Sequence, residues 1–353
     1  MAENSEIVDI DPRANSYLLG HEKEEALLFS AWKSHSLHNS WLFCGVEGIG
    51  KATLAYRFAR FLLNETEINR ETATGLEVSP DSKIFHLVVN NSHPDLKIIE
   101  RDYTDTEKRK ILKALKSGDQ LSDDELQDLK KSAFIRVDDV RTINEFMSKS
   151  ASNDGWRVVI VDSVDELNNA GANAILKVLE EPPHKSILIL VSHNPNKLLP
   201  TIRSRCAKLN FKPLEDNHLA TLLRRYRPNL SESEIKELIK FSGGSVGKAI
   251  VYSDNDALNI YKNLSELVYA KNNFSTSELL KFASTYTKDE DVFALGKEMI
   301  LKFISEHIKN SENVKELAES WDYALKVFDE CERLNLDKKQ TFVNIIYQII
   351  KAI

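Results

Sequence analysis

The chain has 353 residues, of which 42% are hydrophobic and 29% charged, and its formal net charge is −7. This length predicts two or three domains, and an acidic chain lacks the concentrated basic face needed for tight autonomous binding to nucleic acid. Three widely spaced cysteines exclude a disulfide framework and a cysteine zinc cluster. The acidic amino-terminal residues do not resemble a signal peptide, and no stretch approaches the roughly 18 apolar residues of a membrane span. We therefore expect a cytoplasmic protein with no membrane partner.

Short apolar segments that alternate with helical patterns occupy the first two hundred residues. Five of them have the character of strands: 40–44, 96–99, 157–161, 187–191 and 207–211. Uninterrupted apolar strands that alternate with helices are typical of a parallel sheet buried on both faces. We predict an α/β domain over residues 1–212.

The first strand leads into a glycine-rich loop. Residues 45–52 read Gly-Val-Glu-Gly-Ile-Gly-Lys-Ala, which matches the phosphate-binding spacing G-x-x-x-x-G-K-[ST] except at the last position. Backbone N–H groups and Lys51 would hold phosphate, whereas Ala52 has no oxygen for Mg²⁺. Thr53 has a hydroxyl oxygen, but a step of one residue along a helix turns the side chain by about 100 degrees, so we expect this hydroxyl to face elsewhere. The alternative is a glycine-rich turn that only joins the strand to the helix predicted at 51–63.

Residues 101–132 alternate acidic and basic side chains around sparse leucines. This pattern is typical of a solvated helical insertion in the sheet domain. A docking arm for a partner is the alternative.

The strand at 157–161 ends in a carboxylate, Asp162. In loop-type ATPases an Asp at this place helps to hold Mg²⁺, and the next residue is commonly a Glu that activates the attacking water. Here the next residue is Ser163, which is a poor base at neutral pH. A strand-terminal Asp that caps the following turn is the alternative interpretation.

Two arginines follow the fourth strand, in Leu-Leu-Pro-Thr-Ile-Arg-Ser-Arg-Cys at 198–206. Arg203 and Arg205 have no carboxylate nearby in the sequence. An unpaired Arg on a rigid element can act in trans on the γ-phosphate held by a neighbouring subunit. A solvated surface arginine is the alternative.

Beyond residue 212 the strand patterns stop. Residues 213–268 indicate a small helical domain with a break at Phe-Ser-Gly-Gly-Ser-Val-Gly, 241–247, and residues 269–353 indicate a third, all-helical domain.

The order of five segments resembles the clamp-loader branch of the AAA+ ATPases. They are 38–62, Val-Asp-Asp-Val-Arg at 137–141, the strand that ends at 162, Ala-Asn-Ala-Ile-Leu-Lys-Val-Leu-Glu-Glu-Pro-Pro at 172–183, and Ser-Arg-Cys at 204–206. The resemblance covers the sheet domain almost entirely. It implies a RecA-like AAA+ domain, a helical lid and a helical oligomerisation collar. It also implies a hetero-oligomeric ring, with other clamp-loader subunits, a sliding clamp and primer-template DNA as partners.

The resemblance also assigns roles to single residues. A residual nucleotide site would comprise the loop residues, the strand-terminal carboxylate, a first sensor and a second sensor: Gly45, Gly48, Gly50, Lys51, Asp162, Asn194 and Lys248. Motor subunits of the family carry Ser or Thr at the position of Ala52 and Glu at that of Ser163. We therefore expect residual ATP binding without effective magnesium ligation, negligible hydrolysis, no required cofactor and no resident metal. Residues 64–95 hold no cysteine, so the zinc module of many relatives is not expected.

The intact Ser-Arg-Cys motif has a different implication. In the family its arginine reaches the ATP held by the adjacent motor subunit, so Arg205 would be an arginine finger in trans. The chain would then be a subunit of a DNA polymerase holoenzyme and not itself an active ATPase. Two other functions stay open: an active motor subunit that holds magnesium through Thr53 or water, and a helicase-loading or remodelling AAA+ protein unrelated to clamps.

Overall fold

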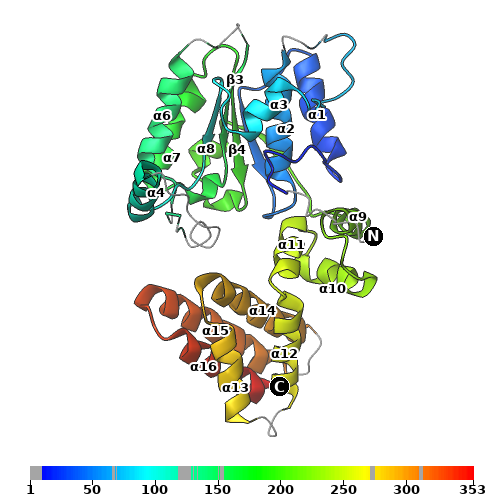
Figure 1. Cartoon of the computed structure of the whole chain (residues 1–353), viewed down its shortest axis with the longest axis vertical. Helices are drawn as coiled ribbons and strands as arrows, with labels where there is room; N and C mark the ends of the chain where they lie inside the picture. Colours follow the sequence, from blue (N-terminus) through cyan, green and yellow to red (C-terminus); the bar gives the residue numbers. More distant parts are fainter. Residues whose placement is uncertain are drawn as a thin grey trace. The chain divides into compact units, whose positions relative to one another are not determined.

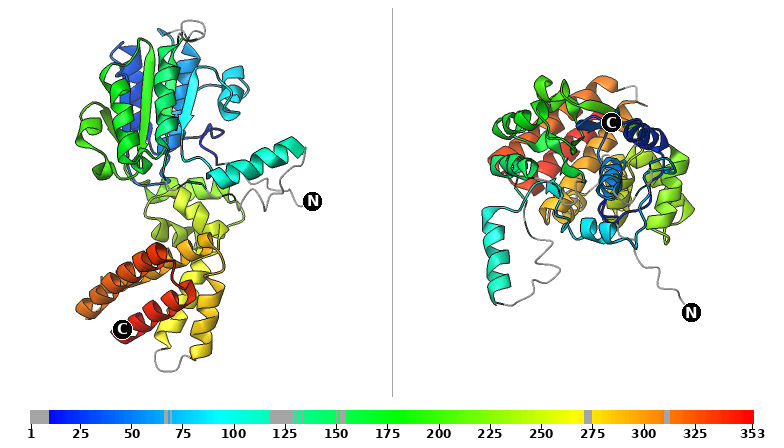
Figure 2. Two further views of the ribbon diagram at one scale, coloured as in Figure 1. Left: turned by 90° about the vertical axis from the view of Figure 1, so that its left-hand side faces the viewer. Right: turned by 90° about the horizontal axis from the view of Figure 1, so that it is seen from above.

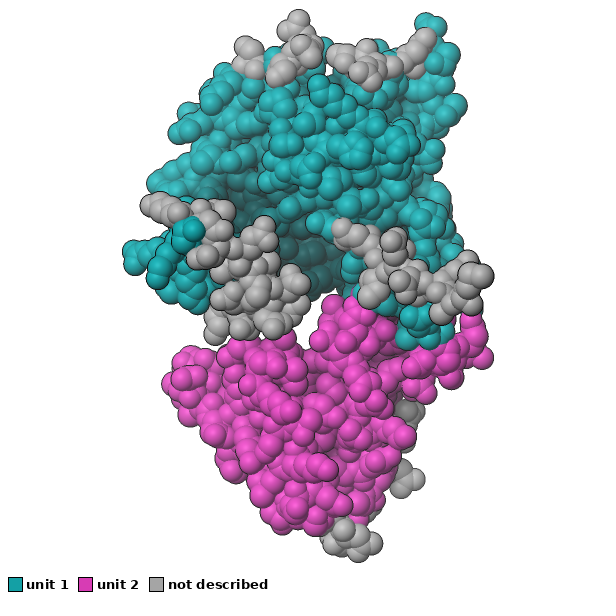
Figure 3. Space-filling model, viewed as in Figure 1, with its two compact units in different colours: residues 1–230, 243–248 teal, residues 231–242, 249–353 magenta. Residues whose placement is uncertain are grey.

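The computed structural model describes residues 10–65, 68, 70–117, 129, 131–132, 134–149, 151, 155–270, 275–309 and 313–353. The chain divides into two compact units, coloured separately in Figure 3: residues 1–230 with 243–248, and residues 231–242 with 249–353. The predicted division into domains 1–212, 213–268 and 269–353 is finer than this and stays a prediction. Within the described part of the chain, every helix is too short or too polar to cross a bilayer.

The first unit is built on a five-stranded parallel sheet. Its strands are β1 (Ser40–Cys44), β2 (Leu96–Ile99), β3 (Arg157–Val161), β4 (Ser186–Ser192) and β5 (Ala207–Asn210), in the spatial order β2-β3-β4-β1-β5. The five predicted strand segments coincide with these strands to within one residue at each end, so the predicted α/β fold is confirmed. Because β1 lies between β4 and β5, the loop that follows it emerges at the switch point of the sheet, where ligands of α/β proteins bind.

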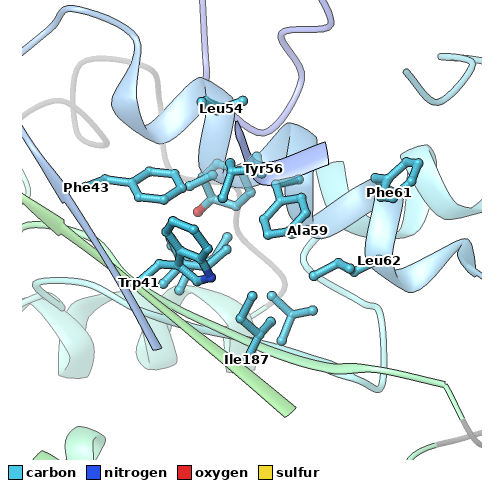
Figure 4. Packing of buried hydrophobic residues seen from close by; sticks show 14 of the residues in the cluster. Trp41, Phe43, Leu54, Tyr56, Ala59, Phe61, Leu62 and Ile187 are labelled. Atoms are coloured by element: carbon cyan, nitrogen blue, oxygen red, sulfur yellow. The ribbon is translucent and has the colours of Figure 1, made fainter. Parts of the chain in front are cut away.

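Helices cover both faces of the sheet (Figure 1). One face carries α1 (Glu22–Lys33), α2 (Lys51–Leu63) and α3 (Lys83–Val89), and the other carries α6 (Val137–Ser148), α7 (Asn169–Glu180) and α8 (Pro200–Arg203). Side chains of β1 alternate between the two cores: Trp41 and Phe43 pack toward α2, as Figure 4 shows, whereas Leu42 and Cys44 pack toward α6 and α7. Burial on both faces explains why the strands have no polar alternation.

The predicted charged insertion is described in part. Helix α4 (Asp105–Ser117) projects from the first unit in Figure 2, while residues 118–128 and 130 lie outside the described residues. The remaining short elements of this unit are the 3-10 turns η3 (Val164–Glu166) and η4 (Pro195–Lys197) and the helix α9 (Asp216–Tyr226).

The second unit is helical among its described residues. It contains α10 (Glu232–Ser242), most of α11 (Val246–Asp254), α12 (Ala257–Tyr269), α13 (Thr276–Thr285), α14 (Glu290–Ile308), α15 (Val314–Leu334) and α16 (Lys338–Ala352). Its core includes the rings of Phe293, Phe328 and Phe342, with centroids 5.1 to 6.2 Å apart. Gly296 lets α14 approach this cluster, because a Cβ there would lie 2.8 Å from the ring of Phe342.

Candidate functional site

The glycine loop joins β1 to α2 at the carboxyl edge of the sheet. Gly48 and Gly50 have φ angles of 72° and 107°, in the left-handed region that favours glycine. Gly50 is the N-cap of α2, so the helix begins directly at Lys51. The strand, the loop and the first free N–H groups of the helix therefore have the order that a phosphate-binding loop requires.

Lys51 turns back onto its own loop. Its Nζ donates to the backbone carbonyl of Gly45 at 2.7 Å and to that of Val46 at 2.5 Å. The residue is only 2% exposed, and this burial lowers the pKa of its amine to about 8, against the opposing attraction of Asp162. The amine that would neutralise a phosphate is thus engaged by carbonyl groups of the loop itself.

The turn that follows α10 covers the loop from within the same unit. Ser245 Oγ donates to the carbonyl of Glu47 at 2.7 Å, and the N–H of Gly247 donates to the carbonyl of Gly48 at 2.8 Å. A Cβ on Gly48 would lie 2.5 Å from Ser245 Oγ and 3.0 Å from the Cα of Gly247, so the two backbones are in direct contact. Lys248, the predicted second sensor, follows this turn, and its N–H donates to Ser245 Oγ at 3.2 Å. The turn at 245–247 thus covers the glycine loop and is hydrogen-bonded to it.

The residues at this edge do not fit a magnesium site. Ala52 has no oxygen, and Thr53 is buried with 8% exposure. Asp162, at the end of β3, keeps a carboxylate there, but burial raises its pKa. Mg²⁺ prefers several hard oxygen ligands in a near-octahedral arrangement, and among these three positions only Asp162 combines an oxygen with a place at the edge.

Ser163 and His193 form a polar pair between β3 and β4. Ser163 has φ 59° and ψ 54°, and its Oγ lies 3.0 Å from His193 Nε2. His193 Nδ1 is buried and has no hydrogen-bond partner among the described residues. Burial, followed by the charge of Lys51, lowers the pKa of the imidazole, so His193 is neutral at physiological pH. His193 is not among the residues predicted from the sequence, although its place directly after a buried strand is a signal that could have indicated it.

Asn194, the predicted first sensor, lies one residue further along and is exposed. Its backbone N–H donates to Asp165 Oδ2 at 3.1 Å. The same carboxylate accepts from Ser192 Oγ at 2.7 Å and from the N–H of His193. Asp165 thus holds the end of β4 through three hydrogen bonds. The side chain that contacts Ser163 in this arrangement is that of His193.

The second carboxylate after Ser163 is also engaged. Glu166 pairs with Arg101 at 2.9 Å, and burial raises the pKa of this carboxyl. Neither Asp165 nor Glu166 therefore takes the place of the glutamate that motor ATPases carry at the position of Ser163.

The arginine edge lies at the end of α8. Arg205 Nη1 donates to the carbonyl of Thr201 at 3.0 Å, and its Nη2 donates to Glu180 Oε1 at 2.8 Å. The expectation of an arginine without a carboxylate partner is wrong, because the fold brings Glu180 to it from 25 residues earlier in the chain. The two side chains stay 36% and 51% exposed. Arg203 is half-buried, and its Nε has no hydrogen-bond partner among the described residues.

Residues 64–95 are the segment in which the resemblance would allow a zinc module, and its first residues are held by hydrogen bonds to Glu65. Glu65 accepts from the indole N–H of Trp32 at 2.8 Å and from that of Trp156 at 2.6 Å, and Arg70 donates to the same carboxylate. The guanidinium of Arg70 stacks 4.1 Å from the centre of the Trp32 ring. Within the described ranges, no group of three or more His, Cys, Asp or Glu side chains is arranged to hold a metal ion.

Comparison with known proteins identifies relatives of this unit. The family described as DNA polymerase III, delta subunit, matches residues 20–215. The chain is 33% identical over 209 residues to DNA polymerase III subunit delta' of Pseudomonas aeruginosa, covering 59% of this chain and 53% of that protein. It is 27% identical to DNA polymerase III subunit delta' of Escherichia coli, covering 65% of this chain and 58% of that protein. The chain therefore spans little more than half the length of these curated relatives.

Among solved structures, the chain is similar to a DNA polymerase III gamma subunit-related protein of Thermotoga maritima. The identity is 18%, the TM-score is 0.47, and the match covers 92% of this chain and 99% of that one.

Proposed function

Because the chain belongs to the DNA polymerase III delta subunit family, we propose that it works as a clamp-loader subunit of a bacterial replicative DNA polymerase. The resemblance to the delta-prime subunit covers the sheet domain almost entirely, and both curated relatives described above carry that subunit's name. Its partners would be the other subunits of a hetero-oligomeric ring, a sliding clamp and primer-template DNA, in the cytoplasm.

Within that ring we assign to this chain a silent nucleotide site, that is, a site that does not hydrolyse ATP. Three observations support the assignment: Ala52 offers no magnesium ligand, Ser163 offers no catalytic base, and the Lys51 amine is bonded to its own loop. The backbone N–H groups of the loop do not depend on residue 52, so the site would retain weak affinity for phosphate while hydrolysis is negligible.

The contribution to catalysis would be made in trans by Arg205. The observation that carries this proposal is a guanidinium held at the surface of a rigid α/β unit, in an intact Ser-Arg-Cys motif. An arginine finger stabilises the charge that develops on the transferred phosphoryl group and raises kcat by a factor of about 10³ to 10⁵ in characterised NTPases. The neighbouring motor subunit would supply the ATP, the magnesium and the water.

Steady-state ATP turnover by the purified chain tests the silent site. We expect no turnover above the uncatalysed background at saturating ATP and magnesium. A rate on the order of 1 per second, which is typical of working enzymes, would contradict the proposal and favour the active motor.

The finger is tested in the complex reconstituted with cognate motor subunits. Arg205→Ala should leave assembly intact and lower ATP turnover at least about 10-fold. Arg109→Ala is the matched control, since it removes an exposed arginine of α4 in the same unit. Equal turnover for the two variants would refute the finger.

A further inference from the structure

The carboxylate of Glu180, which contacts Arg205, lies at a defined place in the fold. Glu180 is the last residue of α7, and the chain leaves the helix there because Pro182 and Pro183 follow. Its neighbour Leu179 is buried against the sheet, as is Ile202 on the short helix that precedes Arg205. The two elements that carry the pair are therefore fixed by the same core.

The contact orients the guanidinium and adds little to stability. An exposed ion pair contributes little to the free energy of folding, because solvent screens it and two long side chains lose freedom. An exposed arginine without partners samples many rotamers, and this freedom is lost when it must reach a single phosphate. Here Thr201 and Glu180 restrict it before any partner arrives, one from within α8 and one from α7.

The geometry leaves donors available. A guanidinium has five N–H groups in a planar fork. Thr201 uses one on Nη1 and Glu180 uses one on Nη2, so the Nε–H and the second hydrogen on each Nη are not used by these two contacts. A carboxylate on one edge of the fork can therefore hold the side chain while another edge faces a phosphate.

We propose that Glu180 is a positioning residue for the arginine finger, which orients Arg205 toward the nucleotide of the neighbouring subunit. This inference rests on the proposed function of Arg205 in trans. Glu180 acts through Arg205 and does not itself touch the nucleotide, so its removal slows the phosphoryl transfer without changing how tightly the motor subunit binds ATP.

The test is the ATPase of the reconstituted complex with Glu180→Ala, Glu180→Gln and the control Glu181→Gln. The control removes a neighbouring carboxylate that is also exposed and follows α7 directly. We expect Glu180→Ala to lower kcat about 3- to 10-fold, as for the loss of one solvent-exposed hydrogen bond, with the KM for ATP within about twofold. Glu180→Gln should keep part of the rate, because its amide oxygen still accepts from Arg205. Unchanged kcat for Glu180→Ala, or an equal loss in the control, would overturn the inference.

A double-mutant cycle separates positioning from a structural effect. In the Arg205→Ala background, Glu180→Ala should have no further effect on kcat, since nothing remains to orient. If the two losses multiply, Glu180 acts independently and the inference fails. If Arg205→Ala alone leaves turnover unchanged, the proposed function fails instead, so the two outcomes are distinguishable.

Discussion

Two ends of the same α/β unit hold a cation in opposite ways. At the glycine loop, Lys51 is 2% exposed and bonded to two carbonyls of its own loop. At the arginine edge, the side chain of Arg205 is 36% exposed and held by partners that occupy only part of its fork. The buried cation is the one that the loop motif would use for a phosphate of its own, and the exposed cation is the one for which we propose a role at a neighbouring subunit.

The difference shows that the backbone of a phosphate-loop motif can form while its lysine is bonded to the loop itself. The glycines at 48 and 50 still adopt the left-handed backbone of such a loop. One of them, however, now receives the turn at 245–247, and the space above it is filled by backbone from the same unit. The motif here has a structural use.

The largest effect that tests this use is expected at Gly48. Gly48→Ala would place a Cβ 2.5 Å from Ser245 Oγ and 3.0 Å from the Cα of Gly247, at a φ of 72°. We expect the free energy of unfolding to fall by about 2 to 4 kcal/mol, from left-handed strain and from overlap. Urea denaturation followed by tryptophan fluorescence measures it, because three of the four tryptophans lie in this unit.

Gly243→Ala is the matched control for that change. Gly243 has a φ of 60°, but a Cβ there would meet no atom within 4 Å. It should lower the free energy of unfolding by only about 1 kcal/mol, from the backbone strain alone. Equal losses at the two glycines would show that the turn does not press on the loop.

The next effect is a pH dependence that comes from Lys51. Burial lowers the pKa of its amine to about 8, from 10.5. Between these values the unfolded chain binds more protons than the folded chain, so the free energy of unfolding rises with pH through this window. Below about pH 8 the amine is protonated in both states, and this gain in stability is absent. Lys51→Met removes the titrating group. We expect the free energy of unfolding of the wild type, relative to that of the variant, to rise by up to about 3 kcal/mol from about pH 7 to about pH 10. Parallel pH curves for the two proteins would contradict the burial of Lys51.

The smallest effect concerns the cover of the loop. Ser245→Ala removes the hydrogen bond to the carbonyl of Glu47. If the covered loop excludes nucleotide, loss of a bond worth about 1 kcal/mol should raise the apparent affinity for ATP about fivefold, measured with a fluorescent ATP analogue. Ser231→Ala, which removes a serine that caps α10 in the second unit, should leave the affinity as it is. An unchanged affinity for Ser245→Ala would mean that the cover does not limit binding.

Local signals predicted most of the sheet unit. The strands are short apolar runs bounded by turns, and their limits follow from that pattern alone; the end of α7 follows from the tandem prolines. The loop, its glycines and the missing hydroxyl at residue 52 are likewise local features. Such signals act over a few residues and do not depend on the partner elements.

The contacts that decide the chemistry join distant parts of the chain. Glu180 and Arg205 are 25 residues apart, and Glu47 and Ser245 are 198 residues apart. No periodicity in the sequence reports which carboxylate meets an arginine after folding. The same reason explains why His193 was missed, because its significance comes from Ser163 on the neighbouring strand connection, 30 residues earlier.

We propose that the loop end and the arginine edge of the unit differ in catalysis, and ATP turnover of the reconstituted complex measures that difference. Asp162→Asn alters the loop end with little change in shape, and Arg205→Ala alters the arginine edge. We predict that Arg205→Ala lowers turnover at least about 10-fold and that Asp162→Asn changes it by less than about twofold. A large loss for Asp162→Asn together with normal turnover for Arg205→Ala would contradict the account, since it would show a chain that hydrolyses its own ATP.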